Sequence, residues 1–153
     1  MADLFPALAL GDCLDEAQAV VLPFKAAAAI TKGQLVEVTV HVSGELGKIT
    51  VAGTDSKVTG VALKSAAVGD VIPVVVLGVV KVTAGGAITV GSPVRAVTDG
   101  KIIVAVTSVT IPSGNIAVTS TSAQPSITVQ SGVACGIALQ TFADTDTGLI
   151  LLK

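Results

Sequence analysis

Hydrophobic and polar residues alternate with a period of two along much of the chain, which is the pattern of half-buried β-strands. The clearest case is residues 34–42, where four valines at alternate positions share one face: Val36, Val38, Val40 and Val42. A turn follows at residues 43–47, and residues 48–51 have the composition of a returning strand. Residues 71–80 form a continuous apolar run, which is typical of a strand buried on both faces.

Turn and helix signals complete this pattern. The tripeptide Thr-Asp-Gly at residues 98–100 predicts a tight hairpin turn before a strand at residues 101–104. Helix signals are weak, because the alanines at residues 26–29 lie between Pro23 and Gly33. Valine and threonine are abundant, and their branched side chains favour a pleated sheet over a helix. We therefore predict an all-β fold, a compact barrel or sandwich of many short strands.

One short module occurs twice along the chain. Gly33 ends the sequence Ile-Thr-Lys-Gly, and Gly91 ends Ile-Thr-Val-Gly. Gly60 begins Gly-Val-Ala-Leu, and Gly136 begins Gly-Ile-Ala-Leu. The stretch between the two motifs is longer in the second copy than in the first, which indicates an insertion there. Because a module this short buries too little apolar surface alone, we expect two degenerate repeats that share one core.

The repeat also suggests how the chain is organised. Pro6 and Gly11 interrupt any helix near the N-terminus, so an extended arm is expected there. A stretch rich in serine and threonine in the second copy predicts a protruding hairpin. The expected boundaries are an arm at 1–19, a single β domain at 20–153, repeat one at about 20–82, repeat two at about 83–153, and the insertion at about 105–131.

Two pairs of repeated residues have structural interpretations. Gly60 and Gly136 open a strand in each copy, which suggests a positive φ or a close backbone contact. Asp70 and Asp146 align and are expected to cap the turn before a core strand by accepting backbone N–H groups. Residues 144–148 also resemble the opening of a calcium loop, but apolar residues follow where further oxygen ligands are required. For Asp146 we therefore prefer the role of a turn cap over that of a calcium ligand.

The composition points to association with other proteins. Hydrophobic residues make up 51% of the 153 residues, and charged residues only 13%, about half the usual share. A monomer with so few charges exposes large apolar patches, and such patches mark association surfaces. We therefore expect a homo-oligomer, or a subunit that docks on a large partner.

Charge and aromatic content exclude other classes of partner. A net charge of −2 with nine Lys and Arg residues is unfavourable for nucleic acid, and the absence of Trp and Tyr leaves few surfaces for stacking bases. The apolar run at residues 71–80 is too short for a membrane span and contains Pro73 and Gly78. The N-terminus lacks the features of a secretory signal. We expect no nucleic acid and no membrane partner, and synthesis in the cytoplasm.

Candidate catalytic and metal-binding groups are sparse. His41 is the only histidine, so no histidine pair can hold a metal, and it is expected on a solvated strand face. Cys13 and Cys135 lie near opposite ends of the chain; two buried thiols are the preferred interpretation, and a disulfide within or between subunits is the alternative. No nucleophile elbow, P-loop or dinucleotide fingerprint is present. The sequence thus predicts no enzyme, no cofactor and no metal site.

Several short motifs rich in glycine and valine follow one another along residues 20–153. They are Ile-Thr-x-Gly-x-x-Val from Ile30, Gly-Val-Ala-Leu from Gly60 with an alanine-rich link to Asp70, Gly-Val-Val-Lys-Val from Gly78, Ile-Thr-Val-Gly-Ser-Pro-Val from Ile88, and Thr-Asp-Gly-Lys from Thr98. This order resembles the capsid decoration, or cement, proteins of tailed bacteriophages. The insertion at about 105–131 departs from the compact pattern of that family.

The resemblance implies a structural protein on the outer surface of the phage capsid. Such a protein clamps neighbouring subunits of the major capsid protein, and it forms a closed homo-oligomer, with a trimer expected before a dimer. Apolar arm residues are then expected to lie against the capsid or a neighbouring subunit: Leu4, Phe5, Leu8 and Leu10. The alternative is a head fibre base or a β-rich adhesin that uses the 105–131 insertion as its contact tip.

Overall fold

The computed structural model describes residues 9–13, 19–40, 43–105 and 133–153. These residues contain no α-helix, and the predicted all-β class is confirmed. The strands are β1 (Val20–Ala26), β2 (Leu35–Val40), β3 (Lys48–Val51), β4 (Gly60–Ala62), β5 (Val71–Thr83), β6 (Pro93–Val97), β7 (Lys101–Val104), β8 (Gly136–Ala138) and β9 (Thr147–Leu152).

The first five strands close into a small barrel. Pairing runs in the order β1-β3-β2-β4-β5, and β1 also pairs with β5, which completes the ring. All of these pairs are antiparallel except β1–β3. A closed ring leaves no continuous sheet edge, which suits short strands rich in valine.

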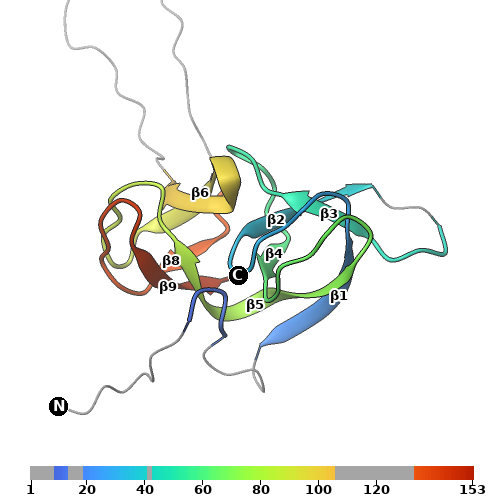
Figure 1. Ribbon diagram of the computed structural model, residues 1–153. Coiled ribbons are helices and arrows are strands. Elements are labelled where there is room, and N and C mark those ends of the chain that lie inside the picture. Colours follow the sequence, from blue (N-terminus) through green and yellow to red (C-terminus); the bar gives the residue numbers. More distant parts are fainter. Residues whose placement is uncertain (1–8, 14–18, 41–42, 106–132) are drawn as a thin grey trace, which may run out of the picture.

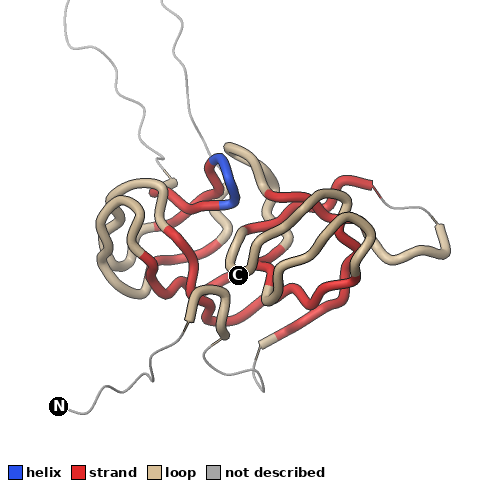
Figure 2. The backbone as a smooth tube through the Cα atoms, in the orientation of Figure 1, coloured by secondary structure: helices blue, strands red, loops and turns tan. Residues whose placement is uncertain are grey.

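The remaining strands form a second group on the other side of β5. The pairing continues from β5 through β9, β8 and β6 to β7, and a parallel bridge between Ala84 and Ile102 brings β7 back to the end of β5. Figure 1 shows β6, β8 and β9 on one side of the molecule and β2, β3 and β4 on the other. In Figure 2 the red strand segments form two groups, and β5 belongs to both.

Strand β5 is longer than the predicted apolar run because it serves both groups. Its first half, up to Leu77, pairs with β1, and the half from Gly78 to Thr83 pairs with β9. The main core cluster likewise draws residues from both groups, including Leu35 and Val61 from one and Ile102 and Ile150 from the other. This cluster therefore joins the two strand groups, and a second cluster, which includes Ile49 and Ile72, belongs to the first barrel alone.

Backbone hydrogen bonds recur in the two halves at the positions that the repeated sequence motifs align. The same donor and acceptor positions are used in each half, with similar N···O distances. Matching bonds are Ile30 to Ala66 (3.0 Å) and Ile88 to Phe142 (2.9 Å), Gly33 to Ala62 (2.8 Å) and Gly91 to Ala138 (2.8 Å), and Ala26 to Asp70 (2.8 Å) and Ala84 to Asp146 (2.8 Å).

Close backbone approach explains the repeated strand glycines. A Cβ atom built on Gly60 would collide with the carbonyl oxygen of Val75, and one on Gly136 would collide with that of Leu151. Neither glycine has a positive φ. Of the two predicted reasons for glycine, close contact is the one that applies.

The predicted turns are also present. Asp70 accepts the backbone N–H of Ala67 (2.9 Å), and Asp146 accepts that of Ala143 (3.2 Å), so both carboxylates cap the turn before a core strand. In the hairpin between β6 and β7, residues 98–100 form a single 3-10 turn in which Asp99 and Gly100 both have φ of 65°. Positive φ at two successive positions is what a tight hairpin turn requires.

Strand β2 is less regular than the alternation of valines predicts. It ends at Val40, and Val36 is fully buried whereas Val38 is 44% exposed. The reason is that β4 pairs with β2 only at Leu35 and Val36, so the later part of the strand is flanked by β3 alone. His41 lies outside the described residues, and so does all of the predicted insertion except Ala105.

Candidate functional site

Residues 9–13, which belong to the predicted arm, dock on β5; we call them the N-terminal segment. The N–H of Gly11 donates to the carbonyl of Lys81 (2.8 Å), and the N–H of Lys81 donates to the carbonyl of Asp12 (3.1 Å). Cys13 then forms an antiparallel bridge with Val80 and belongs to the main core cluster. The segment therefore covers part of one edge of β5.

Side chains reinforce this docking. Asp12 pairs with Lys32 (Nζ to Oδ1, 2.7 Å), and its other carboxylate oxygen accepts the N–H of Ala9 (2.9 Å). The hydrogen bond from Lys32 is the main reason that the pKa of Asp12 lies below its ordinary value, and the bond from Ala9 also contributes. Leu10 lies over Gly33, where a Cβ atom would collide with the leucine side chain.

The lowered pKa of Asp12 gives the docking a dependence on pH. At neutral pH the carboxylate is ionised, and its bonds to Lys32 and Ala9 stabilise the docked segment. Because the pKa is lower when the segment is docked, this contribution is lost as the pH falls below about 4 and through the docked pKa. We expect the amide signals of Gly11 and Lys81 in NMR spectra to shift over that range. In Asp12→Asn the acid-dependent step should be absent; an identical titration in this variant would contradict the assignment.

Exposed apolar side chains gather on β1 and on the part of β5 opposite it. Val20, Val21 and Leu22 are 43%, 36% and 44% exposed, and Leu77, which pairs with Val20, is 45% exposed. Three successive exposed apolar residues on one strand are unusual for a surface that faces only water. This strand is the strongest candidate for a contact surface among the described residues.

A groove of about 490 Å³ lies beside this strand. It lies between the N-terminal segment and the first barrel, and its wall combines apolar side chains with the charged groups of Asp12, Lys32 and Lys64. The lining residues are Gly11, Asp12, Cys13, Val21, Lys32, Leu63, Lys64 and Pro73.

The interface residues predicted from the sequence are only partly described. Leu4, Phe5 and Leu8 lie outside the described residues. Leu10 is half-buried against Gly33 of its own chain, so part of its surface already has an intramolecular partner. The docking of the N-terminal segment was not predicted, although a signal existed. Residues 9–12 read Ala-Leu-Gly-Asp, which matches the Ala-Val-Gly-Asp of the turn at residues 67–70.

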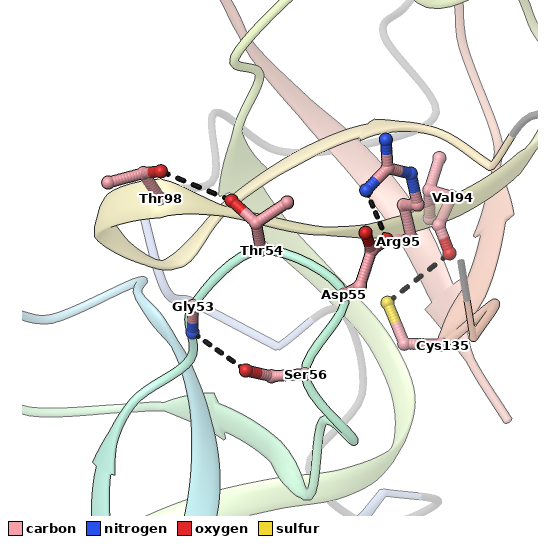
Figure 3. A network of polar contacts seen from close by, with 8 residues as sticks. All are labelled: Gly53, Thr54, Asp55, Ser56, Val94, Arg95, Thr98 and Cys135. Atoms are coloured by element: carbon pink, nitrogen blue, oxygen red, sulfur yellow. Dashed lines mark hydrogen bonds and ion pairs between the residues drawn. The ribbon is translucent and has the colours of Figure 1, made fainter. Parts of the chain in front are cut away.

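Sequence reasoning also missed a buried cation that joins the two halves. Arg95 on β6 is only 7% exposed, and its guanidinium pairs with Asp55 in the loop after β3 (Figure 3). The same loop contacts the hairpin turn after β6 through the hydroxyls of Thr54 and Thr98 (3.2 Å). Gly53 and Ser56 close the loop with an N–H to Oγ bond of 3.0 Å. Polar contacts thus connect the first barrel to the second group of strands.

Both cysteines are buried thiols in the main core cluster, in line with the preferred interpretation. Burial raises the pKa of Cys135 to about 11, and its Sγ donates to the carbonyl of Val94 at 3.4 Å. Among the described residues, no three His, Cys, Asp or Glu side chains are placed to share a metal ion. No helix within those residues has the length and apolar character needed to cross a membrane.

Comparison with known proteins supplies the context for this surface. A search of the curated proteins found no match. Among solved structures, the fold is similar to the head fibre gp8.5 N base in bacteriophage phi29, with a TM-score of 0.58 and 17% sequence identity over 89% of this chain and 95% of that chain. The sequence model of the phage cement proteins matches residues 14–152. The chain therefore belongs to the phage cement protein family and is a structural component of the virion.

Proposed function

We propose that this protein decorates the outer surface of the phage capsid and stabilises it by clamping neighbouring subunits of the major capsid protein. The observation that carries the proposal is the family match over residues 14–152. The exposed apolar strand β1 supports it, because apolar contacts and backbone pairing are weakened little by salt and suit a permanent clamp. We propose no catalytic activity, since the family is a structural one.

Co-sedimentation with expanded, undecorated capsid shells of the source phage tests this function. We expect saturable binding at a fixed ratio to the major capsid protein, and we expect it to persist in high salt. Shells with and without bound protein should then differ in the temperature at which they open. A folded protein that does not bind the shells at any concentration would refute the clamping role.

The arm contact can be tested without disturbing the fold. We propose that Leu4, Phe5, Leu8 and Leu10 contribute to the contact with the capsid or a neighbouring subunit. Deletion of residues 1–8 keeps the bonds of the N-terminal segment to Lys32 and Lys81. Because three of the apolar residues are removed, we expect weaker capsid binding at an unchanged Tm.

A longer deletion is the matched comparison. Deleting residues 1–19 also removes Cys13 from the core and exposes the covered edge of β5, so the Tm should fall as well. Equal capsid binding by the full chain and the chain lacking residues 1–8 would exclude Leu4, Phe5 and Leu8 from the contact.

The second candidate function is a head fibre base or a β-rich adhesin, with the 105–131 insertion as its contact tip. The similarity of the fold to a head fibre base favours this alternative. Strands β7 and β8 are joined by residues 105–135, whereas their counterparts β3 and β4 are joined by residues 52–59.

Replacing residues 106–132 by a short Gly-Ser link discriminates the two functions. The flanking bonds from Ala105 to Pro93 (2.8 Å) and from Cys135 to Val94 (2.8 Å) are retained, so the domain should still fold. We expect capsid binding to be unchanged. Loss of binding by the folded variant would favour the insertion as the contact tip.

The oligomeric state belongs to the same proposal. With 13% charged residues and an exposed apolar strand, we propose a homo-oligomer, first a trimer and second a dimer. Sedimentation equilibrium of the full chain distinguishes these states from a monomer.

A further inference from the structure

The first barrel carries three apolar side chains on its outer face, on neighbouring strands. Leu35 on β2 pairs with Val61 on β4, and Val61 pairs with Val75 on β5. A chain neighbour of each belongs instead to the cluster of the first barrel: Val36, Ala62 and Val74. Because successive side chains of a strand point to opposite faces, Leu35, Val61 and Val75 point outward. We call them the first row.

The second half of the chain covers the first row. Its three residues are fully buried and belong to the cluster that joins the two strand groups. The turn between β6 and β7 lies against Leu35, because a Cβ atom built on Gly100 would collide with the leucine carbonyl oxygen. The N–H of Gly100 also donates to the carbonyl of Ala52 (3.2 Å). The first row is therefore part of the interface between the halves.

The second half carries an equivalent row of its own. Pro93 on β6 pairs with Ile137 on β8, and Ile137 pairs with Leu151 on β9. We call these residues the second row. Pro93 is exposed, and Ile137 and Leu151 are half-buried. The described residues therefore bury the second row less completely than the first.

Backbone hydrogen bonds place the two rows at equivalent positions. The N–H of Ala52 donates to the carbonyl of Leu35 (2.9 Å), and the N–H of Ala105 donates to the carbonyl of Pro93 (2.8 Å). The middle residue of each row follows one of the repeated strand glycines, and it pairs with the last residue in the same antiparallel register. The surface that fits the first row is therefore a guide to the surface that fits the second.

The first half also has a counterpart of the surface that covers the first row. That surface is the end of the β6–β7 hairpin, where Ala96 is fully buried and its carbonyl accepts the N–H of Asp55 (3.3 Å). At the equivalent position of the β2–β3 hairpin, Val38 is 44% exposed. Leu46, near the start of β3, is also 44% exposed. The β2–β3 hairpin thus has exposed apolar side chains where the β6–β7 hairpin has buried ones.

We propose that the second row binds the β2–β3 hairpin of a second copy of this chain, through Val38 and Leu46. The contact would repeat between copies the way in which the β6–β7 hairpin covers the first row within one chain. The inference rests on the proposed homo-oligomer and names its surfaces. Because the two surfaces differ, the contact can repeat from copy to copy and close as a ring, which suits the proposed trimer.

Charged substitutions test each surface separately. Leu46→Lys places a cation in the hairpin surface, and Ile137→Lys places one in the second row, where an apolar partner would leave it unpaired. In sedimentation equilibrium we expect each to raise the dissociation constant of the oligomer at least about tenfold, with an unchanged far-ultraviolet CD spectrum. Val68→Lys is the matched control, because Val68 is 70% exposed and belongs neither to the hairpin nor to the row. It should associate like the wild type.

Mixing the two lysine variants gives a second readout that depends on a gain of association. Leu46→Lys keeps an intact second row, and Ile137→Lys keeps an intact hairpin. In an equal mixture we expect dimers that contain one copy of each variant and no larger species. A mixture that associates no better than either variant alone would contradict a contact between these two surfaces.

Cysteine labelling shows whether a second copy or the same chain covers the surfaces. Leu46→Cys and Ile137→Cys supply one new thiol each, while Cys13 and Cys135 are buried. We expect the new thiols to react with a maleimide in dilute protein and to be protected in concentrated protein. In the double variant a bis-maleimide should yield a covalent trimer, and neither single variant should crosslink to itself. Protection that is independent of protein concentration would overturn the proposal.

The outcomes separate this inference from the proposal on which it rests. If the wild type is oligomeric and both lysine variants associate equally well, these surfaces are wrong while the homo-oligomer stands. If the wild type is a monomer at every concentration, the proposed homo-oligomer fails and this inference fails with it. Co-sedimentation with capsid shells tests the capsid function independently of both.

Discussion

Replacing Asp55 by asparagine is expected to lower the free energy of unfolding by about 2–4 kcal/mol, because it leaves a buried guanidinium without its counter-ion. Arg95 is 7% exposed, so water can replace little of the lost interaction. Asparagine is the suitable substitute, since Asp55 has φ of 60° and asparagine tolerates this left-handed conformation. Urea unfolding of both proteins at pH 7 measures the difference.

The reverse substitution gives an informative contrast. Arg95→Met removes the buried charge and keeps most of the volume, and the side chain of Asp55 is 45% exposed and can be hydrated. We expect a smaller loss of stability than for Asp55→Asn. Thr98→Val removes the exposed hydroxyl contact of the same loop and should change stability by less than about 0.5 kcal/mol. If Arg95→Met is the most destabilising of the three, the interpretation of Arg95 as a buried charge that needs its partner is wrong.

Gly60→Ala should destabilise the fold by about 3 kcal/mol or more, at the upper end of the cost of overpacking. The added methyl group would overlap the carbonyl oxygen of Val75 and contact the side chain of Val74. Backbone cannot move aside as a side chain can, because β4 and β5 are paired at these residues. Thermal and urea unfolding, together with the yield of soluble protein, measure the effect.

Two further glycines supply the controls for this prediction. Gly136→Ala places a methyl group against the carbonyl of Leu151 in the second half and should have a similar effect. At Gly86 the nearest atom to an added Cβ is Cγ2 of Ile103, at 3.6 Å, so Gly86→Ala should be nearly neutral. Gly60→Ala with the stability of the wild type would show that the two strands approach less closely than described.

Local signals in the sequence were sufficient for much of the fold. The strand at residues 48–51 coincides with β3, and the hairpin turn at residues 98–100 lies where it was predicted. Asp70 and Asp146 cap turns as expected. These features depend on residues near one another in sequence, where turn chemistry and strand propensity decide the outcome.

Features that depend on the packing of distant segments were not predictable in this way. Asp55 and Arg95 are 40 residues apart, one in a loop and one in a strand, and no sequence motif surrounds either of them. The sequence therefore does not predict their pairing. The exposure of Val38 follows from where β4 ends rather than from the alternation of β2.

The candidate site was likewise predictable only in part from the sequence. A low content of charged residues predicted exposed apolar surface, but it could not place the exposed Val20, Val21 and Leu22 on β1. The match of residues 9–12 to the turn at residues 67–70 is the one signal in the sequence for the docking of residues 9–13.

The sharing of β5 by both strand groups has a mechanical consequence. A force that separates the two groups acts along the covalent backbone at Leu77 and Gly78, where the strand passes from the first group to the second. The force is therefore shared by the rows of hydrogen bonds that join β5 to its neighbouring strands, and these bonds must break together rather than one after another. In a single-molecule stretching experiment we expect one unfolding step for the described domain, not a separate step for each half.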